Sequence, residues 1–137
     1  MRLSHRVVPR PQGFTLTDFV NRRHMENCIF CKIAKGDIPS TKLYEDNDMV
    51  IIKDINPQAP IHLLLIPKEH YANITEMSAS QAQTLAKCLK KLGSMASELG
   101  LDNGFRIVSN KGSDGRQSVD HLHVHILGGH PLSEVMG

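Results

Sequence analysis

Apolar and polar residues alternate most regularly near the C-terminal end of the chain, over residues 121–126. There the sequence His-Leu-His-Val-His-Ile places one apolar side chain after each histidine. Side chains on a β-strand point to opposite faces in turn, so the pattern predicts one strand with its apolar side chains in the core and three imidazoles on the other face. Gly128 and Gly129 follow, and glycines let the backbone turn or approach a neighbour closely.

The other patterns predict two helices and four more strands. A short helix over Cys28–Lys35 has its apolar residues on one side and ends at Gly36. A long helix begins with a capping box of Ser78 and Gln81, keeps apolar residues at helical spacing as far as Leu99, and ends at Gly100. Short apolar runs bounded by turns predict strands at Lys42–Glu45, Met49–Ile52, His62–Ile66 and Phe105–Ser109. We therefore expect an α+β domain whose sheet is mostly antiparallel, with about five strands.

Two loops carry chemical groups. Asp54–Pro60 contains two prolines, which fix backbone angles, so it is expected to be stiff. The glycine-containing loop Asn110–Ser118 leads directly into the histidine run. Free backbone N–H groups in such a loop can hold phosphate oxygens.

Length, composition and charge limit the kinds of protein that this chain can be. The chain has 137 residues, enough for one domain with a real core. No apolar run approaches the ~18–20 residues of a membrane span, so no membrane partner is expected. The net charge is +2, but residues 1–24 hold five Arg and one Asp, which leaves 11 basic and 13 acidic residues in the rest. That near-neutral body lacks a basic footprint for nucleic acid.

Residues 1–24 show no clear periodicity, and they lack the continuous apolar stretch of a secretory signal. We interpret them as an N-terminal extension, vector-derived or disordered, and expect the domain to comprise residues 25–137. Three cysteines without a credible signal peptide favour a reducing compartment, the cytoplasm.

Three imidazoles on one face indicate chemistry rather than packing, because histidine changes charge nearest neutral pH. Alternate strand residues lie about 6.6 Å apart, so one reacting atom cannot be served equally by all three. The geometry favours a division of labour in which the central residue, His123, faces the reacting centre. A neutral imidazole can attack phosphorus, and a neighbouring imidazolium can protonate the leaving group.

The run from His121 to His125, with Leu127-Gly128-Gly129 after it, resembles the signature of the histidine triad (HIT) family, in its Hint branch of nucleoside phosphoramidate hydrolases. Further matches to the branch occur in the same order along residues 28–130. They are Ile29-Phe30, Asp37-Ile38-Pro39, Asp54–His62, Ile66-Pro67-Lys68 and Asn110–Gly115.

The resemblance implies a homodimer that binds a purine nucleotide in each subunit and hydrolyses a bond to the α-phosphorus. It implies that His123 is the nucleophile, that His125 contacts phosphate and assists the leaving amine, and that His62 supports the nucleophile. Ser118 is implied as a further catalytic contact. The implied nucleotide-binding residues are Phe30, Ile33 and Ile55 for the base, Asp54 for the ribose, and Asn110, Arg116, Gln117 and Ser118 around the phosphate and leaving group.

Two departures from the branch bear on specificity. The branch usually has two glycines before Gln117-Ser118, and here the second is Arg116, which adds a cation and bulk near the phosphates. The chain also stops soon after Gly129, although the family's C-terminal tail shapes leaving-group specificity.

The Cys28-x-x-Cys31 pair has the spacing of half a zinc site. His70 and His121 are its natural completion, as in zinc-bearing bacterial HIT proteins and the related galactose-1-phosphate uridylyltransferases. Such a site would be structural and would leave His123 free. The alternatives are a metal shared by His121 and His123, a thioredoxin-like redox pair, and a cysteine pair that binds nothing.

Three functions compete at this stage. The first is hydrolysis of purine nucleoside phosphoramidates and aminoacyl adenylates through a nucleotidyl-histidine. The second is hydrolysis of diadenosine polyphosphates by another HIT enzyme, against which Gly128-Gly129 argues. The third is a nucleotide- or zinc-binding interaction protein.

Overall fold

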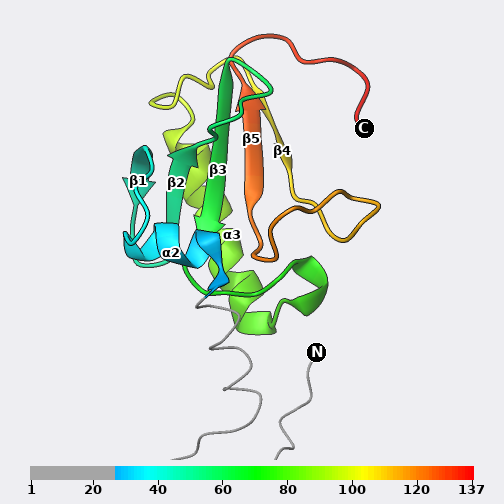
Figure 1. Ribbon diagram of the computed structural model, residues 1–137. Coiled ribbons are helices and arrows are strands. Elements are labelled where there is room, and N and C mark those ends of the chain that lie inside the picture. Colours follow the sequence, from blue (N-terminus) through cyan, green and yellow to red (C-terminus); the bar gives the residue numbers. More distant parts are fainter. Residues whose placement is uncertain (1–26) are drawn as a thin grey trace, which may run out of the picture.

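The computed structural model describes residues 27–137, and the prediction for residues 1–24 lies outside them. One antiparallel sheet of five strands, in the order β1-β2-β3-β5-β4, has helix α2 on one face and α3 on the other (Figure 1). The predicted α+β fold is confirmed, and the sheet is antiparallel throughout. The elements are α2 (Ile29–Lys35), β1 (Lys42–Glu45), β2 (Met49–Lys53), β3 (Ile61–Pro67), the 3-10 helix η3 (Ile74–Glu76), α3 (Ala79–Met95), β4 (Phe105–Val108) and β5 (Val124–Gly128).

Residues at or next to their ends determine where α2 and α3 begin and end. The thiol of Cys28 caps α2 by accepting the backbone N–H of Cys31, and Gly36 ends the helix in the left-handed conformation. The predicted capping box of Ser78 and Gln81 is present at the start of α3. The α3 helix ends at Met95, before the predicted Leu99, because the chain continues in turns instead of further helical hydrogen bonds.

The histidine strand is shorter than predicted, because β5 begins only at Val124. The N–H of Leu122 donates to the carbonyl of Tyr71 rather than to β3, so pairing has not yet begun there. The alternation survives all the same, with Leu122, Val124 and Ile126 buried in one core. The predicted role of Gly128 and Gly129 is confirmed: Gly129 has φ +92°, and a Cβ on Gly128 would lie 2.8 Å from Leu101 Cδ2.

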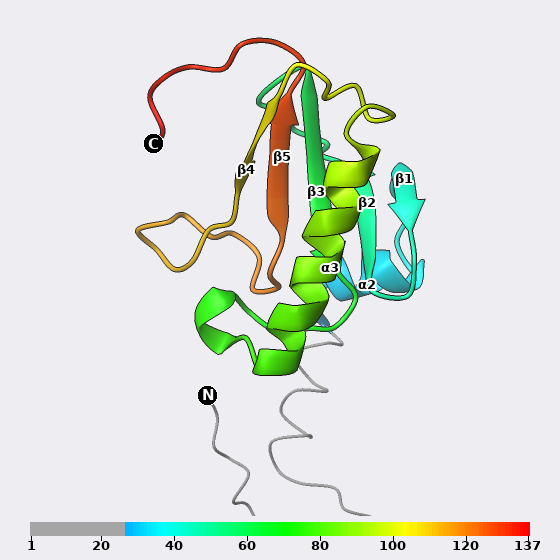
Figure 2. The same cartoon turned by 180° about the vertical axis from the view of Figure 1, so that it is seen from behind.

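Two apolar clusters fill the two faces of the sheet. The larger packs beneath α3, which lies over β2 and β3 in the rear view and leaves β4 uncovered (Figure 2). The smaller lies beneath α2 and contains Phe30, Ile33, Ile52 and Leu64. Odd-numbered residues of β2 face α3 and even-numbered ones face α2, as strand geometry requires. Among the described residues, no helix is both long and apolar enough to cross a membrane.

Candidate active site and metal centre

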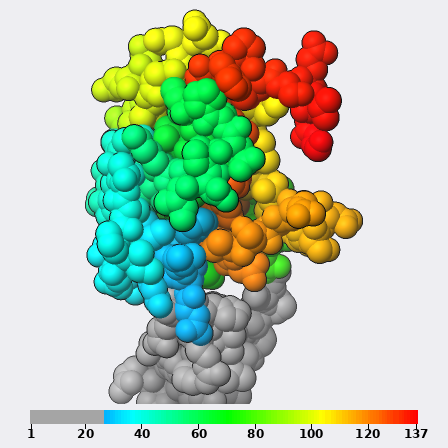
Figure 3. Space-filling view, turned by 45° about the horizontal axis from the view of Figure 1, so that its top comes forward, coloured from blue at the N-terminus to red at the C-terminus, as the bar shows by residue number. Residues whose placement is uncertain are grey.

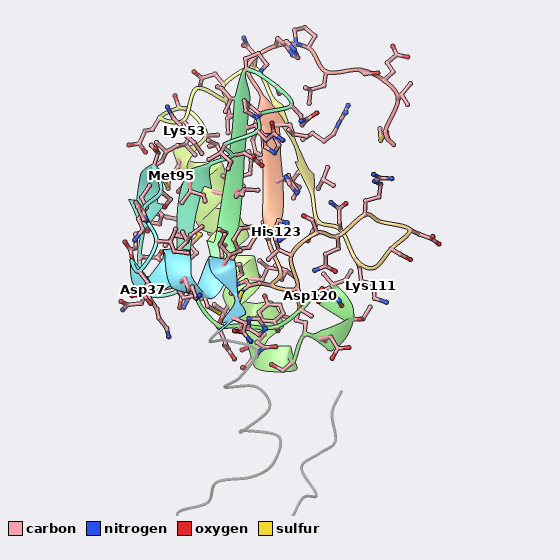
Figure 4. The ribbon with its side chains drawn as sticks, viewed as in Figure 1. Asp37, Lys53, Met95, Lys111, Asp120 and His123 are labelled. Atoms are coloured by element: carbon pink, nitrogen blue, oxygen red, sulfur yellow. The ribbon has the colours of Figure 1, made fainter. Side chains whose placement is uncertain are left out.

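The candidate site lies on the α2 face of the sheet, where β5 begins. Figure 4 shows His123 between α2 and the loop that carries Lys111, while Lys53 lies near the opposite end of the sheet. The loop after β4 stands out from the body beside this region (Figure 3). Because β4 and β5 are antiparallel neighbours, both ends of that loop meet close to His123 and His125.

Hydrogen bonding defines the state of the His123 ring. Its Nδ1 lies 2.7 Å from the backbone carbonyl oxygen of His121. A carbonyl only accepts, so Nδ1 carries the hydrogen and the lone pair is on Nε2. The hydroxyl of Ser109 donates to the carbonyl of His123 at 2.8 Å and fixes the backbone there. None of the described residues hydrogen-bonds Nε2, which leaves this nitrogen available for attack.

His123 is only 5% exposed and lies against the smaller apolar cluster, of which Phe30 is a member. Aromatic rings surround it: Phe30 packs edge-to-face with ring centroids 4.8 Å apart, and His125 lies at 5.1 Å. Burial lowers the pKa of His123, with the hydrogen bond to His121 opposing. The ring is therefore held neutral at physiological pH, which is the nucleophilic form.

Three further side chains form a connected cluster beside His123: Asp54, His62 and His125. The backbone N–H of Gln58 donates to Nδ1 of His62 at 2.9 Å, so the hydrogen of a neutral His62 is on Nε2. That Nε2 lies 2.9 Å from Nδ1 of His125 and 3.2 Å from a carboxylate oxygen of Asp54. When Nε2–H of His62 donates to Nδ1 of His125, Nε2 of His125 keeps its hydrogen as a donor. Asp54, at the end of β2, thus lies together with His62 of β3 and His125 of β5, whereas the sequence assigned the three residues separate roles in one site and predicted no contact among them.

Burial also lowers the pKa of His125, and the nearby rings of His123 and His62 act in the same direction, while Asp54 opposes them. Its side chain keeps 22% exposure, so the ring faces both the cluster and solvent. A histidine with a proton on Nε2 and access to solvent is placed to exchange protons with a leaving group and then with water.

A second cluster brings together Cys28, Cys31, His70 and His121. All four ligand atoms lie within 4.8 Å of one another. Nε2 of His121 lies 2.7 Å from the carbonyl oxygen of Pro67, so it carries the hydrogen and Nδ1 faces the other three residues. The alternative of a metal shared by His121 and His123 is not supported, because the four ligand atoms that the structure brings together include one from His121 and none from His123.

The separations in this cluster fit a tetrahedral metal ion. From Nδ1 of His121 the distances are 3.3 Å to Sγ of Cys28, 3.5 Å to Sγ of Cys31 and 3.1 Å to Nδ1 of His70. A tetrahedral zinc ion separates a sulfur from a nitrogen ligand by about 3.6 Å and two nitrogens by about 3.3 Å. Burial lowers the pKa of His121 to about 4, so its imidazole is the neutral form that binds metal. These four residues can hold a metal ion such as zinc.

The remaining predicted site residues differ in how far they are exposed to solvent. Phe30 and Ile33 lie on the buried side of α2, whereas Ile55 is 99% exposed in the loop that begins with Asp54. Asn110 is half-buried, and Ser118 and Arg116 are exposed in the projecting loop. Arg116 has φ +59°, a left-handed conformation that explains why glycine suits this position.

The side chain of Gln117 has a structural role that the sequence did not predict. Its amide nitrogen donates to the carbonyls of Ala72 and Val119, and its amide oxygen accepts from the N–H of Gly112. The side chain thereby braces the loop against the segment before η3. A contact between Gln117 and nucleotide stays a prediction.

Sequence reasoning missed three supporting groups: the N–H of Gln58, the carbonyl of Pro67 and the hydroxyl of Ser109. The first two are backbone groups that every residue of their kind offers, so no sequence signal marks them. Ser109 directly precedes the predicted loop, and a hydroxyl at the end of a strand is the one weak signal available.

Known proteins resemble this chain in both sequence and fold. A family model described as "Scavenger mRNA decapping enzyme C-term binding" matches residues 27–136. The chain is 48% identical to Protein HitA of Neisseria gonorrhoeae over 104 residues, which are 76% of this chain and 97% of HitA. A HIT family hydrolase from Legionella pneumophila superimposes with TM-score 0.75 and 44% identity, covering 79% of this chain and 97% of the other. The chain belongs to the histidine triad (HIT) family.

A second HIT family hydrolase, from Clostridium thermocellum, gives TM-score 0.76 and 47% identity over 81% of this chain and 97% of its own. A histidine triad protein from Clostridium difficile gives TM-score 0.76 and 44% identity over 80% and 96%. The described domain of this HIT protein therefore matches nearly the full length of these relatives.

Proposed function

We propose that this HIT protein is a hydrolase that cleaves the P–N bond of purine nucleoside phosphoramidates, and also cleaves aminoacyl adenylates. The observation that carries the proposal is the state of His123. Its Nδ1–H is bound by a carbonyl, its Nε2 has a free lone pair, and it lies outside the cysteine cluster. The names of relatives as HIT family hydrolases support the reaction class.

The reaction follows from these positions. Nε2 of His123 attacks the α-phosphorus and forms a P–N bond to the ring while the bond to the leaving amine breaks. His125, in its imidazolium form beside Asp54, gives the proton on its Nε2 to the amine and becomes neutral. Water then attacks the same phosphorus, gives its proton to His125, and releases nucleoside monophosphate and free His123. Atoms and charge balance without any other reactant.

The nucleotide is proposed to lie between α2 and the Asp54–Pro60 loop. Phe30, Ile33 and the exposed Ile55 would enclose the base, and the carboxylate of Asp54 would accept the ribose hydroxyls. Asn110 and Ser118 would contact phosphate. Exposure of Ile55 supports this, because an apolar side chain at the rim of a site gains by covering a flat ring.

The metal in the Cys28, Cys31, His70 and His121 cluster is proposed to be structural zinc. Four protein ligands close the coordination shell and leave no position for substrate. Zinc there would tie α2 to the loop after β3. None of the three cysteines forms a disulfide, which supports a reducing compartment and, we propose, the cytoplasm.

A homodimer is proposed through β4. Within residues 27–137 this strand is at the edge of the sheet and pairs only with β5. Phe105 and Ile107 share a face of β4 and are 38% and 46% exposed. An edge strand with exposed apolar side chains is suited to pair with a second copy of the chain.

A second candidate is cleavage of P–O–P bonds in dinucleoside polyphosphates. The description of the matching family model, which names a decapping enzyme, favours testing it. Gly128-Gly129 after the triad supports the phosphoramidate instead, through the resemblance to the Hint branch.

The test compares kcat/KM for adenosine phosphoramidate with that for diadenosine polyphosphate and a cap dinucleotide. We expect the phosphoramidate to be preferred by at least tenfold, and His123→Ala to abolish its turnover. His130→Ala, an exposed histidine outside the triad, is the matched control and should retain full activity. Preference for a dinucleotide would favour the second candidate, and no turnover of any of the three would refute both.

A further inference from the structure

The short helix α2 contributes to both centres of the site. Cys28 caps its start, Cys31 lies in its first turn, and Phe30 stands between them. The two thiols face His121, while the Phe30 ring faces His123. One turn of helix therefore carries two metal ligands and the aromatic neighbour of the nucleophile.

The Phe30 ring packs against His123 of the candidate active site and against His121 of the metal cluster. Its ring centroid is 4.8 Å from that of His123 and 6.1 Å from that of His121, edge-to-face in each case. A second connection runs along the backbone, where the carbonyl of His121 accepts Nδ1–H of His123. The strand contact is a short-range hydrogen bond to the backbone, so Phe30 is the side chain through which α2 and its two thiols reach His123.

Without a cation, hydrogen bonds can join the members of this cluster only in pairs, with the thiol of Cys28 donating to Nδ1 of His121 and that of Cys31 to Nδ1 of His70. Nδ1 of His121 has a single lone pair, and Cys28, Cys31 and His70 all lie within 3.5 Å of it. One group can donate to that lone pair, whereas a metal ion binds all four ligand atoms together. Metal binding therefore fixes the distance of α2 from His121, and with it the place of Phe30.

We propose that Phe30 is a positioning residue through which the metal centre and the nucleotide site are thermodynamically coupled. Metal binding draws the first turn of α2 onto His121, which presses the Phe30 ring against His123 and forms the wall of the base pocket. Metal and nucleotide then bind cooperatively. This inference rests on the proposed function only in that the nucleotide binds beside Phe30.

The experiment measures AMP affinity by calorimetry for zinc-loaded and metal-stripped protein, with circular dichroism to monitor the fold. We expect zinc to tighten AMP binding by ~5-fold or more, in the usual range of coupling between two sites. Linkage requires AMP to raise zinc affinity by the same factor, which a chelator competition measures independently.

Two variants separate positioning from plain packing. Phe30→Leu keeps an apolar side chain on the helix and should bring the coupling factor close to one while both ligands still bind. Ile29→Ala removes an exposed side chain from the neighbouring position and should leave the factor unchanged. The nitrogen chemical shifts of His123 should change on zinc removal in wild type and not in Phe30→Leu.

The outcomes are distinguishable. Equal AMP affinity with and without zinc overturns the coupling and leaves the proposed function intact. Absence of AMP binding in both forms refutes the proposed function and the coupling with it. If the stripped protein loses its fold, the rate of zinc removal by a chelator decides instead. AMP must slow that removal in wild type but not in Phe30→Leu, and an equal rate with and without AMP overturns the proposal.

Discussion

His121 and His123 use opposite ring nitrogens, although a single residue separates them. Nε2 of His121 donates to the carbonyl of Pro67 and leaves Nδ1 for the cysteine cluster. Nδ1 of His123 donates to the carbonyl of His121 and leaves the lone pair on Nε2. Two backbone carbonyls thus leave the lone pair on a different ring nitrogen in each of these two histidines.

Removing the metal should destabilise the fold. A ligand at a thousand times its Kd stabilises by about 4 kcal/mol. For a domain of this size that corresponds to a decrease in Tm on the order of 10–15 °C.

Cys28→Ser should show the same decrease and lose bound zinc, as measured by calorimetry and elemental analysis. Cys88→Ala, which alters a buried thiol in the other core, should keep one zinc per chain. Full zinc content in Cys28→Ser would contradict the assigned ligand set.

Asp54 should determine recognition of the ribose. Its Oδ1 accepts the N–H of Asn56, and Oδ2 lies beside His62, which holds the carboxylate at the rim of the site. Loss of a hydrogen bond to a charged group costs about 1.5–3 kcal/mol, so Asp54→Ala should weaken AMP binding by roughly 10–100-fold. The dideoxy analogue that lacks both ribose hydroxyls supplies the control. It should bind wild type weakly and be little affected by Asp54→Ala; an equal loss for both nucleotides would rule out the ribose contact.

Stability should fall in mild acid because of His125. Burial lowers its folded-state pKa below the ordinary value, so between those two pKa values the unfolded chain binds more protons. The free energy of unfolding therefore rises with pH across that interval. The contribution of His125 to it decreases as the pH falls below about 6.5, the ordinary pKa of histidine. Urea unfolding of metal-stripped protein at about pH 7.5 and about pH 5.5 measures the effect.

In that comparison His125→Gln should lose part of the pH dependence, since it removes the titrating ring. His130→Gln, at an exposed position, should keep the wild-type slope. Identical slopes in wild type and His125→Gln would show that His125 does not titrate with a lowered pKa.

The exposed face of β4 should determine the oligomeric state. Ile107→Asp places a charge on the proposed pairing strand and should convert the dimer into a monomer in light-scattering measurements. Ile74→Asp changes another exposed isoleucine, in η3, and should remain dimeric. A monomeric wild type, or a dimeric Ile107→Asp, would contradict pairing through β4.

Local patterns predicted most of the fold because each had a local cause. The capping box set the start of α3, Gly36 set the end of α2, and alternation placed Leu122 and Val124 in the core. The start of β5 could not be predicted, because it depends on Tyr71, a residue far away in sequence, taking the N–H of Leu122.

The candidate site divides in the same way. Side-chain types and their resemblance to HIT proteins indicated the four members of the metal cluster, and the structure brings them together. The choice of ring nitrogen for His121, His123 and His62 depends on backbone groups of Pro67, His121 and Gln58. Such groups carry no sequence signal, so tautomers become visible only in three dimensions. The roles assigned to Asn110, Ser118 and Arg116 stay predictions.

The most direct test of the account is to find the covalent intermediate. Protein mixed with adenosine phosphoramidate and quenched in alkaline denaturant, where phosphohistidine-type bonds survive, should gain one adenylyl group by mass spectrometry. Peptide mapping should locate that group on His123, and His123→Ala should show none. Turnover without any adduct in rapidly quenched samples, or an adduct on another residue, would contradict the assignment of His123 as the nucleophile.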